Sequence, residues 1–455
     1  MKQSRYNYLT KREGEYVLYN ALSDKFLLIN PDLADLFENS PVDKIEKIHP
    51  QFFQVLCQNG FLVNENLNEY EELLHQWDME DNDESKFTLT VNPTLKCNLR
   101  CWYCYEDHDN PPQDLSSETL NAIKRFIESV IDNPKLKHFQ LSFFGGEPFL
   151  RYNQVIFPLI SYSYNLCKTL NKNISVNFTT NGVLITDKYI RQLSSFNIPM
   201  SFQITLDGNK TFHNSTRVGK NKNGTYSTII NNIRKLAEIQ QTVVYLRCNY
   251  TANNLQSFAD VATDLGQFPN LIKQRISVNF ERIWQDDSVS DIVIPETLDW
   301  VMKKFLLAGY NVSNNDYVVK HRCYADSNRA IVINSDGKLF KCTARDFITS
   351  NSEGEILNDG SIKWNERHLL RLQTKGGSRA CQTCIIFPIC GASCSQNRLE
   401  RLRQTGCLLD RNSEAIRNIL EKRINSLIDI SLKHLTEKKK TYQAEDDWTL
   451  TMILK

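Results

Sequence analysis

Several features that would assign a chain to a common functional class are missing from these 455 residues. The N-terminal stretch MKQSRYNYLTKREGEY has no apolar segment of the kind that a secretory signal peptide needs. No run of about 18 apolar residues occurs anywhere in the chain. Basic and acidic residues nearly cancel, 54 against 53, so no large basic surface for nucleic acid is visible. We therefore expect a cytoplasmic protein that binds neither a membrane nor nucleic acid.

What the chain does contain is cysteine. Hydrophobic residues make up 41% and charged residues 24%, as in soluble globular proteins, and the length implies about two to four domains. Thirteen cysteines in a large chain without a signal peptide indicate metal or redox chemistry more than disulfides. Ten of them fall in two blocks, whereas Cys57, Cys167 and Cys248 stand alone in apolar or strand-like surroundings. We expect these three to be buried as small hydrophobic residues.

Residues 1–80 have the pattern of a small winged-helix-like domain. Short strand-like runs, YNYLT, EYVLYN and KFLLIN, precede two helical patterns, PDLADLFEN and QFFQVLCQNGFLV. Three strands and about three helices suit such a unit. The acidic run DMEDNDESK that begins at Asp78 reads as a linker.

From Lys86 onward, strand-like and helical patterns alternate. Six strand-like runs are KFTLTVN, HFQLSFF, ISVNFTT, MSFQITL, VVYLRCNY and RISVNFE, and the helical patterns between them include SETLNAIKRFIESVI, TDKYIRQLSSF and YSTIINNIRKLAEIQ. Such alternation predicts an α/β fold with parallel strands and right-handed crossovers. Over residues 86–310 the predicted form is a complete or partial (β/α)6 barrel. Residues 311–410 read as a loop-rich, cysteine-rich domain, and residues 411–455 as a helix followed by a mobile polar tail.

Three cysteines directly follow the first barrel strand, on the loop where barrel enzymes carry their chemistry. Cys97, Cys101 and Cys104 have spacings of three and two residues between them. Three thiolates can hold three corners of a [4Fe-4S] cluster and leave the fourth iron free. Zinc is the alternative, and it would take a fourth ligand, for which His108 is the nearest candidate.

The motif C-x3-C-x-aromatic-C after a first strand, with GGEP after the second strand, resembles the signature of radical S-adenosylmethionine (SAM) enzymes. The resemblance implies that the three cysteines hold a [4Fe-4S] cluster whose free iron binds the amino and carboxylate groups of SAM. Gly145 and Gly146 would let backbone carbonyls approach the ammonium group closely. Glu147 would accept a charge-assisted hydrogen bond nearby.

Two further segments extend this resemblance. Tyr103, inside the cysteine motif, would present its backbone or ring near the adenine. The stretch ITLDGNKTFHNSTR resembles the fourth-strand segment of the same enzymes, in which Thr205 would hydrogen-bond the ribose or carboxylate region. Arg217 would pair with the methionine carboxylate through its planar fork. Phe144 departs from relatives that carry a polar residue immediately before GGEP.

The second block contains seven cysteines in about 85 residues, with few apolar runs between them, which suggests a core built on metal rather than hydrocarbon. Its spacings resemble the SPASM extension of radical enzymes that modify peptides and proteins. Two zinc ribbons are the alternative, although seven is an awkward number for two tetrahedral sites. The resemblance implies two auxiliary [4Fe-4S] clusters, and so three in all. One would be held by Cys381, Cys384, Cys390 and Cys407, and the other by Cys323, Cys342 and Cys394.

Some relatives supply an eighth cysteine just before the first of these seven. Here the segment NNDYVVKHRC offers only Tyr317, Lys320 and His321. The first auxiliary cluster is therefore predicted either to have an open iron that binds a substrate atom or to be closed by His321.

The resemblance implies reductive cleavage of SAM to a 5′-deoxyadenosyl radical, driven by a low-potential donor such as flavodoxin or ferredoxin. The N-terminal unit resembles the precursor-recognition element of ribosomal peptide maturases, which binds a leader peptide as an added strand. The leading interpretation is a maturase that forms a thioether or carbon-carbon crosslink in a precursor peptide.

Two alternatives remain. An anaerobic sulfatase-type maturase places an acidic base directly after the cysteine that matches Cys342, whereas this chain has Thr343 there and Asp346 three residues later. A non-catalytic zinc-binding interaction protein would not turn over SAM at all.

Overall fold

The computed structural model describes residues 1–12, 14–106, 114–219, 223–286, 293–314 and 323–441. The chain divides into two compact units. The first consists of residues 1–80, 316–323 and 370–455, and the second of residues 81–315 and 324–369. The predicted first domain thus ends where the first segment of unit 1 ends, whereas residues 311–410 contribute to both units. The division into four domains stays a prediction.

Unit 1 contains a three-stranded antiparallel sheet in the order β2-β3-β4. The three predicted strands are present as β2 (Asn7–Arg12), β3 (Glu15–Asn20) and β4 (Lys25–Ile29), and the helices that follow are α1 (Pro31–Asn39), α2 (Val42–Ile48) and α3 (Pro50–Gln58). The predicted helical stretch after residue 51 ends early. Gly60 has a φ of +79°, and β5 (Leu62–Val63) then pairs with β1 (Lys2–Gln3).

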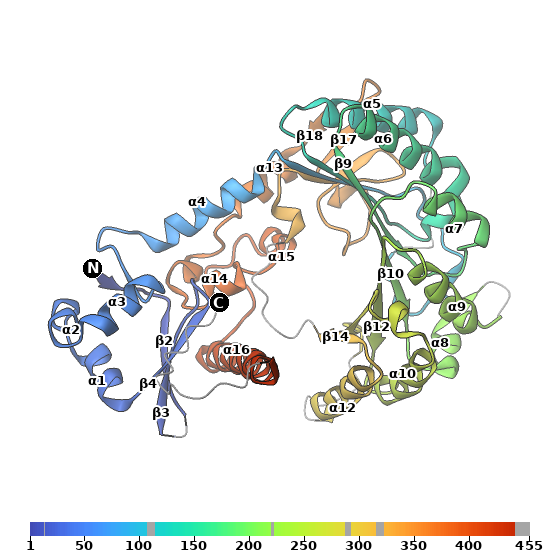
Figure 1. Ribbon diagram of the computed structural model, residues 1–455. Coiled ribbons are helices and arrows are strands. Elements are labelled where there is room, and N and C mark those ends of the chain that lie inside the picture. The colour runs from blue at the N-terminus through green and yellow to red at the C-terminus, as the bar shows by residue number, and fades with distance from the viewer. Residues whose placement is uncertain (13, 107–113, 220–222, 287–292, 315–322, 442–455) are drawn as a thin grey trace. The chain divides into compact units, whose positions relative to one another are not determined.

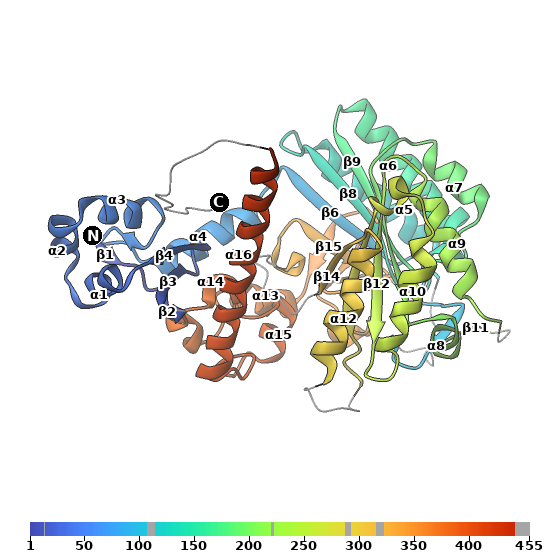
Figure 2. The ribbon, with the colours of Figure 1, turned by 60° about the horizontal axis from the view of Figure 1, so that its bottom comes forward.

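The two faces of this small sheet are both covered. Leu18 and Leu27 pack with α1 and α3, while Val17 and Tyr19 pack with α16 (Ser413–Thr441) from the far end of the chain. Figure 2 shows α16 as a long helix beside β2, β3 and β4. The predicted C-terminal helix is therefore present, and it belongs to the core of the N-terminal sheet.

The predicted linker at Asp78 is wrong in its first residues. Helix α4 (Glu69–Asp81) continues through Asp81. Tyr70, Leu73 and Trp77 recur at helical spacing and pack against the core of unit 1, so they hold the helix in place; most of its acidic residues are exposed, while Glu69 and Asp81 are buried. Unit 1 also contains η6 (Arg379–Thr383), α14 (Phe387–Cys390) and α15 (Ser395–Glu400).

Unit 2 is built on one open, mixed sheet of eleven strands. The six predicted barrel strands are present, adjacent in chain order and all parallel, which confirms that part of the prediction. They are β6 (Lys86–Val91), β8 (His138–Phe143), β9 (Asn173–Thr180), β10 (Met200–Leu206), β12 (Thr242–Tyr250) and β13 (Ile276–Arg282).

The sheet continues beyond both ends of this set. β14 (Asn311–Asn314) pairs with β13, and on the other side β15 (Ala330–Ile333) pairs with β6. The antiparallel strands β16 (Lys338–Phe340), β17 (Gly354–Ile356) and β18 (Ile362–Trp364) follow. We expected a metal-based core beyond residue 310, but β15 and β16 bury Ile331, Ile333 and Leu339 in the apolar core of the sheet.

The larger helices of unit 2 lie along one face of this sheet (Figure 1). They are α5 (Ser117–Asp132), α6 (Phe157–Thr169), α7 (Asp187–Ser194), α9 (Tyr226–Ala237), α10 (Phe258–Gly266) and α12 (Val293–Leu307). Shorter elements are η1 (Pro148–Arg151), η2 (Tyr152–Ile156), α8 (Lys210–Thr216), η3 (Leu255–Ser257), α11 (Asn270–Lys273), η4 (Tyr324–Asp326), η5 (Thr349–Asn351) and α13 (Glu366–Gln373), the last of which reaches into unit 1.

The two faces of the parallel strands differ in polarity. On the helix side, Phe143, Phe178 and Phe202 stack across three strands, with ring centroids 5.5 Å and 4.6 Å apart. The opposite face carries half-buried polar side chains such as Asn177 and Gln203. The apolar-polar alternation of these strands therefore yields a sheet with one face available for polar groups. This differs from the packed interior of a closed eight-stranded barrel.

Of the three isolated cysteines, Cys167 and Cys248 are buried, as predicted, whereas Cys57 is only partly buried at the edge of the α1–α3 core. No helix within the described part of the chain has the length and apolar character needed to cross a membrane.

Candidate active site

A cavity of about 580 Å³ in unit 2 brings most of the predicted SAM-site residues together. It lies where the parallel strands end, and its wall includes polar residues of β9, β10 and β12. The predicted residues that line it are Cys97, Cys101, Tyr103, Cys104, Gly145, Gly146, Thr205 and Arg217. Of the predicted SAM-site residues, Glu147 alone is not part of the wall.

The cysteine loop is fixed by a strand pair that the sequence did not reveal. β7 (Leu99–Cys101) pairs with β11 (Arg217–Gly219) in antiparallel fashion, so that Cys101 and Arg217 are directly opposed. At the start of the loop, the Asn181 amide donates to Asn98 Oδ1 at 2.7 Å and lies 3.8 Å from Cys97 Sγ. The loop is therefore held at both ends before any cofactor binds.

Burial disfavours the thiolate forms of these cysteines. It raises the pKa of Cys97 to about 12 and that of Cys104 to about 11. A thiolate here therefore needs a compensating cation, which iron supplies when a cluster binds. Among the described residues, no three His, Cys, Asp or Glu side chains are arranged around a single-ion site. A [4Fe-4S] cluster does not need such a single-ion site, because each of its thiolate ligands binds a different iron atom.

The two glycines of GGEP are required by the backbone of the cysteine loop itself. A Cβ atom on Gly145 would lie 2.5 Å from the Thr94 carbonyl oxygen, and one on Gly146 would lie 2.4 Å from that of Lys96. The Glu147 amide donates to the same Lys96 carbonyl at 2.9 Å. The glycines therefore let the loop after β8 pack directly against the segment that leads into Cys97.

Glu147 lies behind this contact and is completely buried. Its Oε1 accepts hydrogen bonds from the Phe149 amide at 3.1 Å and the Thr180 hydroxyl at 2.8 Å, and its Oε2 accepts one from the Asn181 amide at 2.8 Å. Burial outweighs these bonds and raises its pKa to about 7. Both oxygens thus accept hydrogen bonds within the protein, so Glu147 holds the loops in place, and its predicted contact with the ligand stays a prediction.

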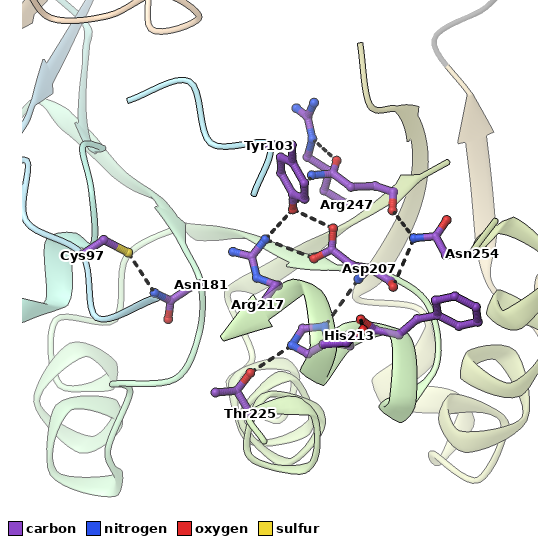
Figure 3. A network of polar contacts seen from close by, with 12 residues as sticks. Cys97, Tyr103, Asn181, Asp207, His213, Arg217, Thr225, Arg247 and Asn254 are labelled. Carbon is purple, nitrogen blue, oxygen red and sulfur yellow. Dashed lines mark hydrogen bonds and ion pairs between the residues drawn. The ribbon is translucent and has the colours of Figure 1, made fainter. Parts of the chain in front are cut away.

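Tyr103 and Arg217 share a partner that the sequence analysis did not single out (Figure 3). The Tyr103 hydroxyl donates to Asp207 Oδ1 at 2.6 Å and accepts from Arg217 Nη1 at 2.7 Å. Arg217 Nη1 also lies 3.2 Å from Asp207 Oδ2, an ion pair whose side chains are almost fully buried. Asp207 directly follows β10, at the end of a strand where site residues are expected. Its place directly after a strand was the feature of the sequence that could have indicated a role for Asp207.

The backbone of Asp207 is held as well. Its amide donates to His213 Nδ1 at 3.4 Å, its carbonyl accepts from the Asn254 side chain at 3.1 Å, and the other nitrogen of His213 lies 3.1 Å from the Thr225 hydroxyl. Burial lowers the pKa of His213 to about 3, so this ring is neutral. Asp207 thus combines a fixed backbone with a carboxylate that orients two residues of the cavity.

A carboxyl group that the sequence analysis missed lies in the cavity wall. Glu106, two residues after Cys104, is buried, and within the described residues its Oε2 has no hydrogen-bond partner. Burial, with a smaller contribution from Asp346, raises its pKa to about 8, so the group is mostly protonated at neutral pH. Thr343, also in the wall, is fixed by Tyr324, whose hydroxyl lies 2.7 Å from its side-chain oxygen and 2.8 Å from its amide nitrogen.

A second cavity, of about 510 Å³, lies in unit 1. It is lined by the four cysteines predicted to hold one auxiliary cluster, Cys381, Cys384, Cys390 and Cys407. Arg411 Nη1 donates to Cys390 Sγ at 3.3 Å, which places a cation beside a thiol whose pKa is raised by burial. Four cysteines around one cavity suit the predicted tetra-thiolate cluster.

The remaining predicted ligands are divided between the units. Cys323 and Cys394 belong to unit 1 and Cys342 to unit 2, so their assignment to one cluster stays a prediction. Cys394 Sγ accepts a hydrogen bond from the Asn397 amide at the start of α15. The alternative ligands Tyr317, Lys320 and His321, and the zinc candidate His108, lie outside the described residues.

Comparisons with known proteins agree with this arrangement. Residues 91–265 match the model of the radical SAM superfamily. The chain is 22% identical over 412 residues to the radical SAM cyclopropyl synthase TigE of Paramaledivibacter caminithermalis, covering 83% of this chain and 82% of that protein. It is 29% identical over 155 residues to the cysteine-type anaerobic sulfatase-maturating enzyme of Clostridium novyi, covering 33% of this chain and 40% of that protein.

Among solved structures, anSMEcpe with bound AdoMet and Kp18Cys peptide has the same fold. The TM-score is 0.55 at 18% identity, with 75% of this chain and 99% of that chain covered. This likeness concerns the fold alone.

Proposed function

We propose, from the premise that this chain is an enzyme of the radical SAM superfamily, that it is a peptide maturase. It forms a thioether or carbon-carbon crosslink in a ribosomally made precursor peptide. The observation that carries this proposal is the single cavity in which the three cysteines of the motif meet Thr205 and Arg217. The cyclopropyl synthase relative, aligned over most of both chains, supports a bond-forming reaction.

Arg217 is suited to bind the methionine carboxylate of SAM. Its Nη1 is occupied by Tyr103 and Asp207, whereas its buried Nε has no partner among the described residues. Because the guanidinium is a planar fork, Nε and Nη2 can together present two donors to one carboxylate. Thr205 contributes a hydroxyl to the same wall. Tyr103, held by its hydroxyl and by the Gln285 amide on its carbonyl at 2.8 Å, keeps the loop between the last two cysteines in place.

The proposed cofactors are SAM and three [4Fe-4S] clusters. Cys97, Cys101 and Cys104 would hold the first, and SAM bound there would supply radical chemistry, with electrons from a donor such as flavodoxin or ferredoxin. Support for the second comes from the four cysteines around the cavity of unit 1. The third, on Cys323, Cys342 and Cys394, has either an open iron that binds a substrate thiolate or His321 as its fourth ligand.

Leader recognition is proposed for the three-stranded sheet of unit 1. A leader bound as an added strand needs an edge with unpaired backbone groups. The side chains of Tyr8 and Arg12 on β2 contact Glu421 of α16, which occupies that flank of the sheet. On the other edge strand, β4, Leu28 is 43% exposed, an apolar contact for a bound peptide. We therefore assign the leader to the β4 edge.

The sulfatase-type alternative is less well supported. Its base would stand at Thr343, a hydroxyl that does not ionise at neutral pH and that already interacts with Tyr324. The similarity to the sulfatase-maturating relative covers a third of this chain and two fifths of that protein. Crosslink chemistry therefore remains the preferred reaction.

The proposal is tested by incubating the anaerobically reconstituted enzyme with SAM, a reductant and the precursor encoded beside its gene. A crosslink removes two hydrogen atoms from the peptide, which mass spectrometry detects, and its product does not react with a hydrazide. A hydrazide-reactive product carries an aldehyde and would indicate formylglycine. An unmodified peptide in the presence of active SAM cleavage would reject the maturase role for that precursor.

A further inference from the structure

The part of the active-site cavity beyond the predicted SAM residues is rich in arginine. Arg247 on β12, Arg282 at the end of β13 and Arg345 all line it, in addition to Arg217. Within the described lining, the one carboxyl group is Glu106, against four arginines. Arg217 is already balanced by Asp207. Arginines thus outnumber carboxyl groups in the described lining of the cavity.

Arg247 has the clearest geometry of these residues. It is paired in register with Thr205 on β10 and with Asn279 on β13, so it shares a face of the sheet with both. Its Nε donates to Asn249 Oδ1 at 2.8 Å, which fixes the direction of the guanidinium. Figure 3 shows the side chain beside Tyr103. In the described part of the molecule, no carboxylate lies within ion-pair distance of Arg247.

We infer that Arg247 binds a carboxylate of the substrate peptide, an inference that rests on the proposed maturase function. That carboxylate belongs either to an aspartate or glutamate side chain near the reacting residue or to the C-terminus of the peptide. The Nη atoms remain for a two-point contact once Nε is used by Asn249. Asp207, which interacts with Arg247 beyond ion-pair distance, is already paired with Arg217, so the half-buried guanidinium of Arg247 is incompletely compensated and a substrate carboxylate would supply the missing charge.

The cofactor offers a competing carboxylate, and the geometry separates the two. Arg217 is almost fully buried beside the cysteine loop and opposite Cys101, where the amino acid end of SAM would lie. Arg247 lies on β12 of the main sheet, whereas Arg217 lies on β11 in the separate two-stranded sheet, and the hydrogen bonds that connect them run through Asn249 and Tyr103. We therefore assign Arg217 to the cofactor and Arg247 to the peptide.

The test uses small probes, because the precursor is not needed to detect the contact. N-acetylglutamate N-methylamide, N-acetylglutamine N-methylamide and N-acetylglutamine with a free carboxylate are titrated by ligand-observed NMR into the reconstituted full-length enzyme with SAM present. The wild type is expected to bind at least one carboxylate probe about tenfold more tightly than the neutral amide. Which carboxylate probe binds more tightly identifies a side-chain or a C-terminal source.

Three variants complete the test. Arg247→Gln should reduce the preference to less than about twofold, whereas Arg247→Lys, which keeps the charge but loses the fork, should retain part of it. Arg191→Gln, an exposed arginine on α7 outside the cavity, should behave like the wild type. The affinity for SAM should be unchanged in Arg247→Gln and reduced in Arg217→Lys.

Equal binding of all probes by the wild type would overturn the inference, as would a carboxylate preference that persists in Arg247→Gln. An affinity for SAM that falls about tenfold in Arg247→Gln would assign this residue to the cofactor instead. If Arg247→Gln does not fold, the result for Arg247→Lys decides. Peptide-independent SAM cleavage is measured on the same samples. A wild type that does not cleave SAM would contradict the proposed function, whereas normal cleavage without carboxylate preference would contradict this inference alone.

Discussion

Arg217 lies directly opposite Cys101 in the antiparallel pairing of β7 with β11, and its guanidinium turns back to the carboxylate of Asp207. The residue assigned to the SAM carboxylate is thus attached by its backbone to the loop assigned to the iron-sulfur cluster. A displacement of the cysteine loop therefore also moves Arg217, so we expect cluster binding and SAM binding to depend on each other.

Removing the carboxylate of Asp207 should destabilise the folded protein strongly. In Asp207→Ala, the buried guanidinium of Arg217 loses its counter-charge and the Tyr103 hydroxyl loses its acceptor. An uncompensated buried charge costs about 3–5 kcal/mol. Denaturant unfolding measures this directly. Asp359→Ala, at an exposed carboxylate of the same unit, should cost far less, and equal losses in the two variants would contradict the buried ion pair.

Gly146 should tolerate no side chain. The Cβ atom of Gly146→Ala would meet the carbonyl oxygens of Leu95 and Lys96 at 2.5 Å and 2.4 Å, and backbone atoms cannot move aside cheaply. We expect a loss of about 1–3 kcal/mol in the free energy of unfolding and reduced iron at the first cluster. Gly266→Ala on α10, where the nearest atom is 4.0 Å away, is the matched control and should be neutral or slightly stabilising. Full iron loading of Gly146→Ala would show that the two loops do not pack as described.

The pKa of Glu147 should be visible in the pH dependence of stability. Its folded-state pKa of about 7 exceeds the value of about 4.3 expected in the unfolded chain. The folded state therefore binds the proton more tightly, and this contribution is complete below about pH 4.3 and is lost as pH rises through 7. The free energy of unfolding of the wild type relative to Glu147→Gln should fall by roughly 4 kcal/mol across that window. A difference that does not vary between pH 5 and 8 would contradict the buried, protonatable carboxyl.

The β4 edge can be tested without removing any domain. Leu28→Asp places a charge on the proposed leader-binding edge and should weaken binding of the precursor about tenfold, measured by fluorescence anisotropy of a labelled leader. Peptide-independent SAM cleavage should be unchanged, because Leu28 belongs to unit 1. The control is Ile48→Asp, at an exposed position on α2 of the same unit. Equal leader affinities in both variants and the wild type would reject the β4 assignment.

The sequence predicted the parallel strands well because each alternates apolar and polar residues over six or more positions. The members of both cysteine cavities were implied by the family resemblance of the two cysteine motifs, and the spacings alone did not separate Cys407 from Cys394. It did not reveal β7 and β11, which are three residues each and are defined only by their pairing across more than a hundred residues. The role of Asp207 was also missed, since a lone aspartate after a strand gives no sign that its partners are Tyr103 and Arg217.

The composition of unit 1 lay beyond sequence reasoning for a related physical reason. Its core joins α4 to the segment after residue 370, as in the hydrogen bond from the Tyr70 hydroxyl to the Gly376 carbonyl at 3.1 Å. Nothing in either segment alone indicates this contact. Deleting residues 1–80 would therefore expose the core around Phe387 and Leu420, which is why a point change on β4 is the better test of leader recognition.

The most direct measurement is the yield of 5′-deoxyadenosine, together with iron content, from anaerobically reconstituted wild type and from the variant in which Cys97, Cys101 and Cys104 are all changed to alanine. The wild type should contain about twelve irons per chain and cleave SAM when reduced. The variant should retain about two thirds of the iron, bound by the second cysteine block, and form no 5′-deoxyadenosine. SAM cleavage that persists in the variant would contradict the assignment of these three cysteines to the radical cluster.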